Sequence, residues 1–206
     1  TDDEIDFISN AAAMHDIGKI SVPDYILNKP GRLTKEEFEQ MKKHTVYGCG
    51  ILEMIPFFKG EKIFSYSYDI CRHHHERWDG RGYPDGLKGD EISIGAQVVS
   101  IADVYDALVS ERVYKKAFPR EKARDMIAGG ECGCFNPLLV QEFLKIEPEL
   151  YETMYKENEA VKDNDERIAW MRKAPIEENE TKLSERTIQL LEMERKKYQI
   201  LSELSG

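Results

Sequence analysis

The chain has 206 residues, of which 41% are hydrophobic and 33% are charged, and its formal net charge is −10. This length and composition are typical of a globular protein with one sizeable core and room for an appendage. The acidic balance argues against binding to a DNA or RNA polymer, and no apolar run approaches the roughly 20 residues of a membrane-spanning helix. The four cysteines form no disulfide framework, so we expect reduced thiols in a cytoplasmic protein.

The first half of the chain is predicted to be helical. Apolar residues recur at helical spacing over residues 5–15 and predict a helix there. Thr34 and Glu37 form a capping box, which predicts the start of a helix that continues to about Met54 and contains His44.

The second half continues the helical pattern after one long loop. A helix is expected over residues 61–74, and the glycine- and aspartate-rich residues 76–95 are expected to form a loop. The apolar residues 96–110 predict another helix, and two more are expected to start at Pro119 and Pro137. With no clear alternation of a strand, the sequence predicts an all-α protein.

The C-terminal part of the chain differs in character from the rest. Residues 157–180 are strongly charged, and residues 182–204 are typical of one long polar helix. This helix could pack on its own domain, or it could connect to another domain as a short coiled coil. We therefore divide the chain into a helical domain, 1–156, and a charged helical extension, 157–206. The extension could join sensory or signalling domains, or pair two copies in a homodimer.

Histidines and aspartates form a pattern that indicates a metal-bound hydrolytic centre. On a helix, adjacent side chains point about 100° apart, so His15 could hold one metal while the Asp16 carboxylate bridges to a second. Two neighbouring metals can supply hydroxide at neutral pH and clamp a phosphate. Each residue alone is more often a packed or solvated side chain, but together they are candidate ligands for divalent metals: His15, Asp16, His44, His74, His75 and Asp103.

The chain resembles the HD-GYP family, bacterial hydrolases of the second messenger cyclic di-GMP, over about residues 11–137. His15-Asp16, the pair His74-His75 and the loop that ends in Gly82-Tyr83-Pro84 carry the resemblance. It implies an HD-domain helical bundle with two divalent transition metal ions, Fe or Mn first and Zn or Ni as alternatives. One metal is implied to bind His15, Asp16 and Asp103. The second is implied to share Asp16 and to add His44, His74 and His75.

The resemblance also implies roles around the metals. Asp16 and Lys19 are the expected catalytic residues, with Lys19 steadying the phosphate or protonating the leaving oxygen. Tyr83 could present its ring to a guanine face. The positions implied to contact substrate are Gly82, Tyr83, Pro84, Arg112 and Lys115. His73 falls outside the motif, and we interpret it as a supporting or exposed residue.

The implied reaction is metal-dependent hydrolysis of cyclic di-GMP to linear pGpG, with GMP as a possible further product. Two alternatives stay open. One is a non-hydrolytic module that senses cyclic di-GMP, and the other is an HD phosphohydrolase that acts on another nucleotide. Asp16 and Lys19 favour an enzyme over a sensor, and Tyr83 favours the cyclic dinucleotide.

The N-terminal segment departs from the family pattern. HD-GYP domains usually carry a preceding helix whose glutamate and histidine serve a third metal in some members. Only 14 residues precede His15, none of them is a histidine, and Glu4 is too close to His15 to match the family glutamate. We therefore expect that the ligand helix is absent and that the centre holds at most two metals.

Overall fold

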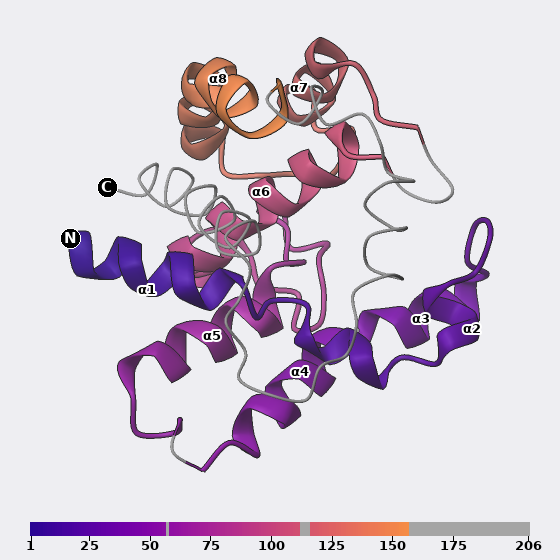
Figure 1. The fold of residues 1–206 in the computed structure, drawn as a ribbon, viewed down its shortest axis with the longest axis vertical. Coiled ribbons are helices and arrows are strands. Elements are labelled where there is room, and N and C mark those ends of the chain that lie inside the picture. The colour runs from indigo at the N-terminus through magenta and orange to yellow at the C-terminus, as the bar shows by residue number, and fades with distance from the viewer. Residues whose placement is uncertain (57, 112–115, 157–206) are drawn as a thin grey trace, which may run out of the picture.

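The computed structural model describes residues 1–56, 58–111 and 116–156 (Figure 1). The all-α prediction is confirmed, since the described residues form helices and no β-strand, with a single antiparallel bridge between Asp79 and Lys88. None of the described helices is long and apolar enough to cross a membrane. The predicted extension 157–206, with its predicted dimer contact, lies outside the described residues.

The α-helices are, in chain order, α1 (Asp2–Ala12), α2 (Asp24–Leu27), α3 (Lys35–Lys42), α4 (His44–Glu53), α5 (Lys62–His73), α6 (Ile94–Val109), α7 (Arg120–Ala128) and α8 (Pro137–Tyr151). Two 3-10 helices lie between them, η1 (Ile17–Ser21) and η2 (Gly89–Glu91). A π-helical turn, Glu152–Lys156, follows α8.

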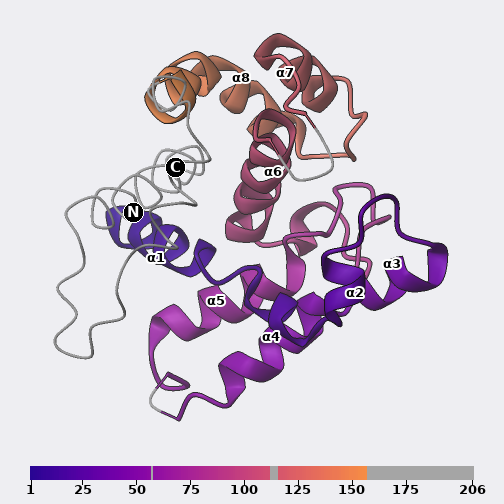
Figure 2. The ribbon, with the colours of Figure 1, turned by 45° about the vertical axis from the view of Figure 1, so that its right-hand side comes forward.

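Helix α6 lies at the centre, with α7 and α8 on one side and α1 and α5 on the other (Figures 1 and 2). Toward α8 it buries Tyr105, whose ring packs on Phe143 at a centroid distance of 5.1 Å. Toward α1 and α5 it buries Val99, in one cluster with Ile8 and Ile70. Because α6 is apolar in both directions, it joins the two halves of the molecule into one structure.

A third apolar cluster joins α4 to α5 and also holds the segment between α1 and η1. Leu52 is fully buried in this cluster, and Met14 and Ile17 pack against it. A Cβ at Gly18 would lie only 1.9 Å from the carbonyl oxygen of His44, so η1 can approach α4 this closely only with glycine there. The residues between Met14 and Gly18 are therefore held against the beginning of α4.

The single helix predicted from Thr34 to about Met54 is wrong, because the structure has two helices there. The capping box at Thr34 is present, but α3 ends at Lys42 and α4 begins at His44. The hydroxyl of Thr45 donates to the carbonyl oxygen of Lys42 at 3.0 Å. A side chain thus satisfies a carbonyl at the end of α3, and such a bond competes with a continuous helix. His44 consequently lies at the start of a helix rather than inside one.

The helix predicted over residues 5–15 ends early, at Ala12. His15 lies in the turn after α1, and Asp16 is the residue that precedes η1. The angular argument for two adjacent helical side chains therefore does not apply to this pair.

The remaining helices predicted within the described residues are present. Helix α6 begins slightly earlier than predicted, at Ile94, because Ser93 caps it by accepting a hydrogen bond from the backbone N–H of Ala96. Pro119 is the residue before α7, and Pro137 is the first residue of α8, as expected from the fixed φ of proline.

Candidate metal centre

The six predicted metal ligands lie together, although they come from separate parts of the chain. His15 and Asp16 are in the turn before η1, His44 begins α4, and Asp103 lies in α6. His74 and His75 follow the end of α5 directly. The site is therefore built where the N-terminal segment, α4, α5 and α6 meet.

The carboxylate of Asp16 lies between two groups of side chains. Its Oδ2 is 3.3 Å from Nε2 of His15, and that nitrogen is also 3.8 Å from Oδ1 of Asp103. Its Oδ1 is 3.4 Å from Nε2 of His44 and 3.9 Å from Nε2 of His74. The two oxygens of one carboxylate thus face two different sets of candidate ligands.

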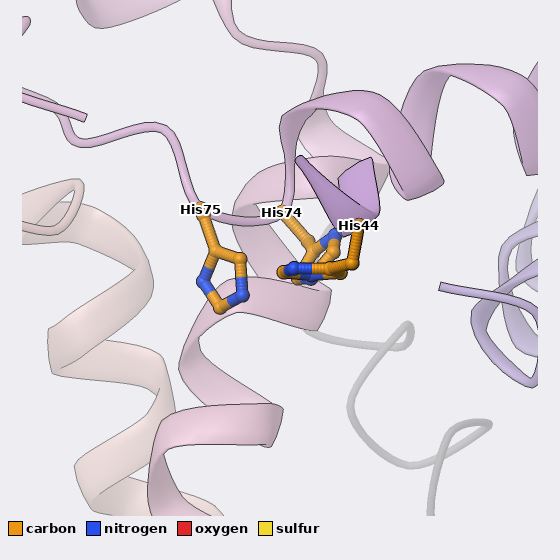
Figure 3. Close-up of side chains that lie close together, drawn as sticks. All are labelled: His44, His74 and His75. Carbon is orange, nitrogen blue, oxygen red and sulfur yellow. The ribbon is translucent and has the colours of Figure 1, made fainter. Parts of the chain in front are cut away.

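His75 joins the second of these sets. Its ring centroid is 4.1 Å from that of His74 and 5.1 Å from that of His44. Figure 3 shows the three rings gathered in one place, and each offers a nitrogen within 4.8 Å of the others. A second group within the same distance consists of His15, Asp16 and His74.

Backbone carbonyls orient three of the four imidazoles. The Nδ1 atoms of His15, His44 and His74 lie 2.7, 2.8 and 3.0 Å from the carbonyl oxygens of Ala12, Met41 and Ile70. A carbonyl oxygen can only accept, so each Nδ1–H donates and Nε2 is left as the basic nitrogen. Metal-binding histidines are commonly oriented in this way.

Burial keeps the second set of imidazoles neutral. It lowers the pKa of His74 to about 3 and that of His75 to about 2, and it also lowers the pKa of His44. Neutral imidazole is the form that binds metal ions. This set can therefore donate three lone pairs at neutral pH without first losing a proton.

The first set is charged instead. Burial opposes the charge on His15, but the neighbouring carboxylates of Asp103 and Asp16 outweigh it and raise its pKa to about 10. Burial likewise opposes the charge on Asp16, yet contacts with His15 and Lys19 hold the pKa of that carboxyl far below its usual range. The pKa of Asp103 is lowered as well, because the contact with His15 outweighs the effect of burial. The protonated His15 thus neutralises the carboxylates of Asp16 and Asp103. A bound cation would neutralise the same two carboxylates in its place.

The side chains of this centre fit metal ions. Oδ1 of Asp16 is buried and accepts no hydrogen bond from the residues that the structure describes, which is costly for a carboxylate oxygen. A divalent cation would satisfy it, and imidazole with carboxylate suits Fe, Mn, Zn and Ni. Lys19, one turn along η1, forms an ion pair with Oδ2 of Asp16.

An aromatic wall extends from the metal centre. The ring of Tyr83 lies 4.8 Å from that of His75, and the ring of Phe38 lies edge-on to Tyr83 at 6.3 Å. The ammonium of Lys42 is 5.2 Å from the Phe38 ring and 5.4 Å from the Tyr83 ring. Sequence reasoning missed Phe38 and Lys42. The sequence did contain a signal for them: an aromatic residue and a lysine lie four residues apart, and therefore on one helix face, shortly before His44.

The loop residues beside Tyr83 have packing roles that the sequence analysis did not anticipate. A Cβ on Gly82 would lie 2.4 Å from the backbone nitrogen of Arg77 and from Cα of Glu76. Glycine at this position therefore lets the loop lie directly on the residues after His75. This packing explains the glycine without a contact to substrate. Pro84 follows in the same segment. The other two predicted substrate contacts, Arg112 and Lys115, lie outside the described residues.

Comparison with known proteins identifies the family of the chain. The HD domain family matches residues 3–131, so the chain belongs to that family. Within it, the resemblance to HD-GYP proteins is confirmed by relatives named as cyclic dinucleotide phosphodiesterases.

Three of these relatives illustrate the similarity. A probable cyclic di-GMP phosphodiesterase of Vibrio cholerae is 44% identical over 142 residues, which cover 68% of this chain and 32% of the relative. A cyclic di-GMP phosphodiesterase of Thermotoga maritima is 46% identical over 152 residues, or 74% of this chain and 40% of the relative. A 3′3′-cGAMP-specific phosphodiesterase of Vibrio cholerae is 40% identical over 142 residues, which cover 69% of this chain and 26% of the relative. The chain thus spans less than half the length of these relatives.

Proposed function

We propose that this chain hydrolyses a phosphodiester bond of cyclic di-GMP and releases linear pGpG. The observation that carries the proposal is the Asp16 carboxylate, whose two oxygens face His15 on one side and His44 with His74 on the other. A carboxylate placed between two sets of metal-binding side chains is suited to hold two cations side by side. The names of the relatives support cyclic di-GMP as the substrate.

The proposed cofactors are two divalent ions, with Fe or Mn expected and Zn or Ni as alternatives. When bound, such ions would generate a nucleophilic hydroxide at neutral pH and would neutralise charge on the phosphate. In this proposal one ion would be held by His15, Asp16 and Asp103. The other would be held by the shared Asp16 together with His44, His74 and His75.

The chain's own residues would complete the reaction. Asp16 stays ionised at neutral pH because its pKa is far below the usual range. His74 and His75 stay neutral and keep their lone pairs for binding. The Lys19 ammonium lies beside Asp16, and in this proposal it would stabilise charge on the phosphate and would protonate the ribose 3′ oxygen as it leaves.

Substrate recognition is proposed to use the aromatic wall. Tyr83 and Phe38 offer ring faces to a guanine base, and Lys42 adds a positive charge for a phosphate. Phe38 is 45% exposed, so its ring is accessible to a ligand. Gly82 and Pro84 shape this segment, and Arg112 and Lys115 stay proposed phosphate contacts on the strength of their sequence positions.

We also propose that the protein acts in the cytoplasm. Cysteines in the described residues are free thiols, as expected in a reducing compartment: Cys49, Cys71, Cys132 and Cys134. Sensory domains and a second copy of the chain stay proposed partners of the extension 157–206.

The test is direct hydrolysis by the purified protein. The protein is loaded anaerobically with Fe²⁺ or with Mn²⁺, incubated with cyclic di-GMP, and the products are separated by chromatography. We expect pGpG, followed by GMP if the linear product is cut again. A parallel reaction with 3′3′-cGAMP tests the other nucleotide that appears among the relatives' names. Tight binding of cyclic di-GMP without any product would contradict the proposal and favour a sensor.

A further inference from the structure

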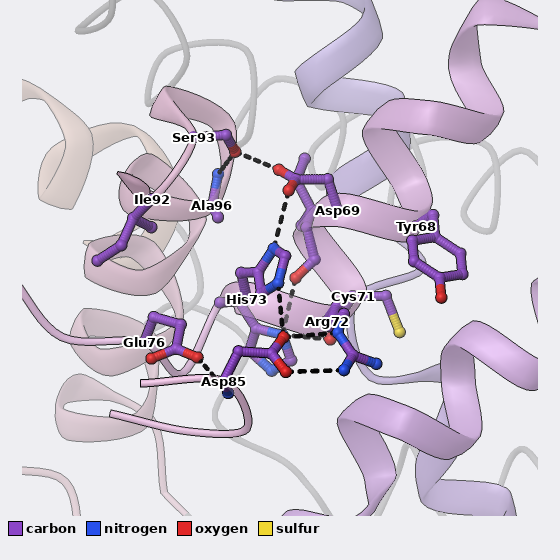
Figure 4. Close-up of polar contacts among 12 residues, drawn as sticks. Tyr68, Asp69, Cys71, Arg72, His73, Glu76, Asp85, Ile92, Ser93 and Ala96 are labelled. Carbon is purple, nitrogen blue, oxygen red and sulfur yellow. Dashed lines mark hydrogen bonds and ion pairs between the residues drawn. The ribbon is translucent and has the colours of Figure 1, made fainter. Parts of the chain in front are cut away.

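His73, the first histidine of the run His73-His74-His75, does not face the metal centre. Its Nδ1 lies 2.8 Å from Oδ1 of Asp69 and its Nε2 lies 3.0 Å from Oδ2 of Asp85. Both ring nitrogens are therefore engaged by carboxylates outside the proposed ligand set (Figure 4).

Asp85 is also held by the residue before this histidine. The Arg72 guanidinium donates from Nε to Oδ2 of Asp85 at 2.6 Å and from its second nitrogen, Nη2, to Oδ1 at 2.8 Å. Such a two-pronged contact constrains direction as well as distance. One carboxylate thus attaches the loop after Tyr83 to the last turn of α5.

The same loop segment is held through its backbone. Glu76 is only 3% exposed, and its Oε1 accepts hydrogen bonds from the backbone N–H of Asp85 at 2.7 Å and of Gly86 at 3.0 Å. Gly82 lies directly on the backbone of Glu76 and Arg77. Tyr83 therefore sits between two anchored points, and both anchors are on the chain that carries His74 and His75.

The contacts extend to α6. Asp69 bridges from His73 to the hydroxyl of Ser93, which donates to its Oδ2, and Ser93 in turn caps α6. Loop, α5 and α6 are thereby joined through Asp85, His73, Asp69 and Ser93 (Figure 4).

We propose that Arg72, His73 and Asp85 form a positioning clamp, which fixes Tyr83 at a set distance from the metal centre and so determines how well the substrate binds. None of the three is a proposed metal ligand or substrate contact, so they are positioning residues. The claim about substrate rests on the proposed function, whereas the claim about the loop does not.

The test uses two single variants, their double variant, a partial-rescue variant and a matched control. Arg72→Gln and Asp85→Asn each remove one charge from the clamp, and Arg72→Gln with Asp85→Asn removes both. Glu142→Gln is the control, because Glu142 also pairs with a cation, Lys145, at 2.5 Å but lies far along the chain on α8. Arg72→Lys keeps the charge without the two-pronged contact and should rescue part of the effect.

Two measurements are made on each metal-loaded protein. Hydrogen exchange should show faster deuterium uptake by residues 82–87 in both single variants and unchanged uptake in Glu142→Gln. The KM for cyclic di-GMP should rise on the order of tenfold, as expected from the loss of a charge-assisted contact, while kcat and metal content stay near those of the wild type. The double variant should be no worse than Asp85→Asn alone, because Arg72→Gln removes only a contact that Asp85→Asn already disrupts.

The outcomes separate the two proposals. Wild-type exchange and wild-type KM in both single variants would overturn the clamp, and so would effects that add fully in the double variant. A fall in kcat and in metal content with an unchanged KM would also overturn it, because that pattern indicates general damage to the centre. If the wild-type protein hydrolyses no cyclic di-GMP, the proposed function fails, and hydrogen exchange alone then decides whether Arg72 and Asp85 hold the loop.

Discussion

Asp16→Asn is the most informative change in this protein. The asparagine has nearly the same shape, but its side chain is neutral and its amide nitrogen cannot bind a cation. In the structure each carboxylate oxygen serves a different set of imidazoles, at 3.3 Å on one side and 3.4 Å on the other. The variant therefore loses one charged contact to each proposed metal.

The expected magnitude follows from these two contacts. Interactions with charged groups contribute about 1.5–3 kcal/mol each, so the combined metal affinity should fall on the order of 10²–10⁴-fold. Elemental analysis after desalting should find two ions in the wild-type chain and almost none in Asp16→Asn, and hydrolysis of cyclic di-GMP should disappear.

Asp24→Asn provides the control for this experiment, because it makes the same chemical change at an exposed position eight residues further along. It should keep both metals and full activity. Near-normal hydrolysis by Asp16→Asn would refute the two-metal reasoning, and three ions at the wild-type centre would show that it has ligands beyond the six described.

Three further predictions address other parts of the molecule. Phe38→Ala should weaken binding of cyclic di-GMP by about tenfold and leave the metal content unchanged. Calorimetry on metal-loaded protein measures this affinity, and an affinity equal to that of the wild type would show that the aromatic wall does not bind the substrate. His15 has a folded-state pKa of about 10, above its ordinary 6.5, so its stabilising effect on metal-free protein is complete below pH 6.5 and is lost as pH rises through 10. Thermal melts of metal-free protein should show this loss, and His15→Gln should lack it. Glu147→Gln should destabilise the fold by about 3 kcal/mol, because fully buried Glu147 accepts from Arg120 and from Tyr105. Chemical denaturation would measure that change, and a stability equal to the wild type would mean that this buried pair contributes nothing.

The amino-acid sequence by itself determined the local features of this protein. Thr34 caps α3, Pro119 precedes α7 and Pro137 opens α8 as predicted, because capping bonds and the fixed φ of proline act within a few residues. Helical spacing of apolar residues was enough to predict an all-α chain. The sequence was also enough to select the candidate ligands by residue type, because imidazole and carboxylate groups can bind metal ions in any fold.

Only the tertiary structure decided where those side chains meet. Asp16 lies in a turn and not on a helix, and its position follows from the close packing of Gly18 on α4. Phe38 meets Tyr83, and His73 meets Asp85, although each pair is separated by many residues and by at least one turn of the chain. Helical periodicity describes one element at a time, whereas these contacts depend on how α3, α5 and the loop before α6 pack on one another. Packing between distant segments leaves no regular pattern in the sequence, and for that reason the aromatic wall and the loop clamp emerged only from the fold.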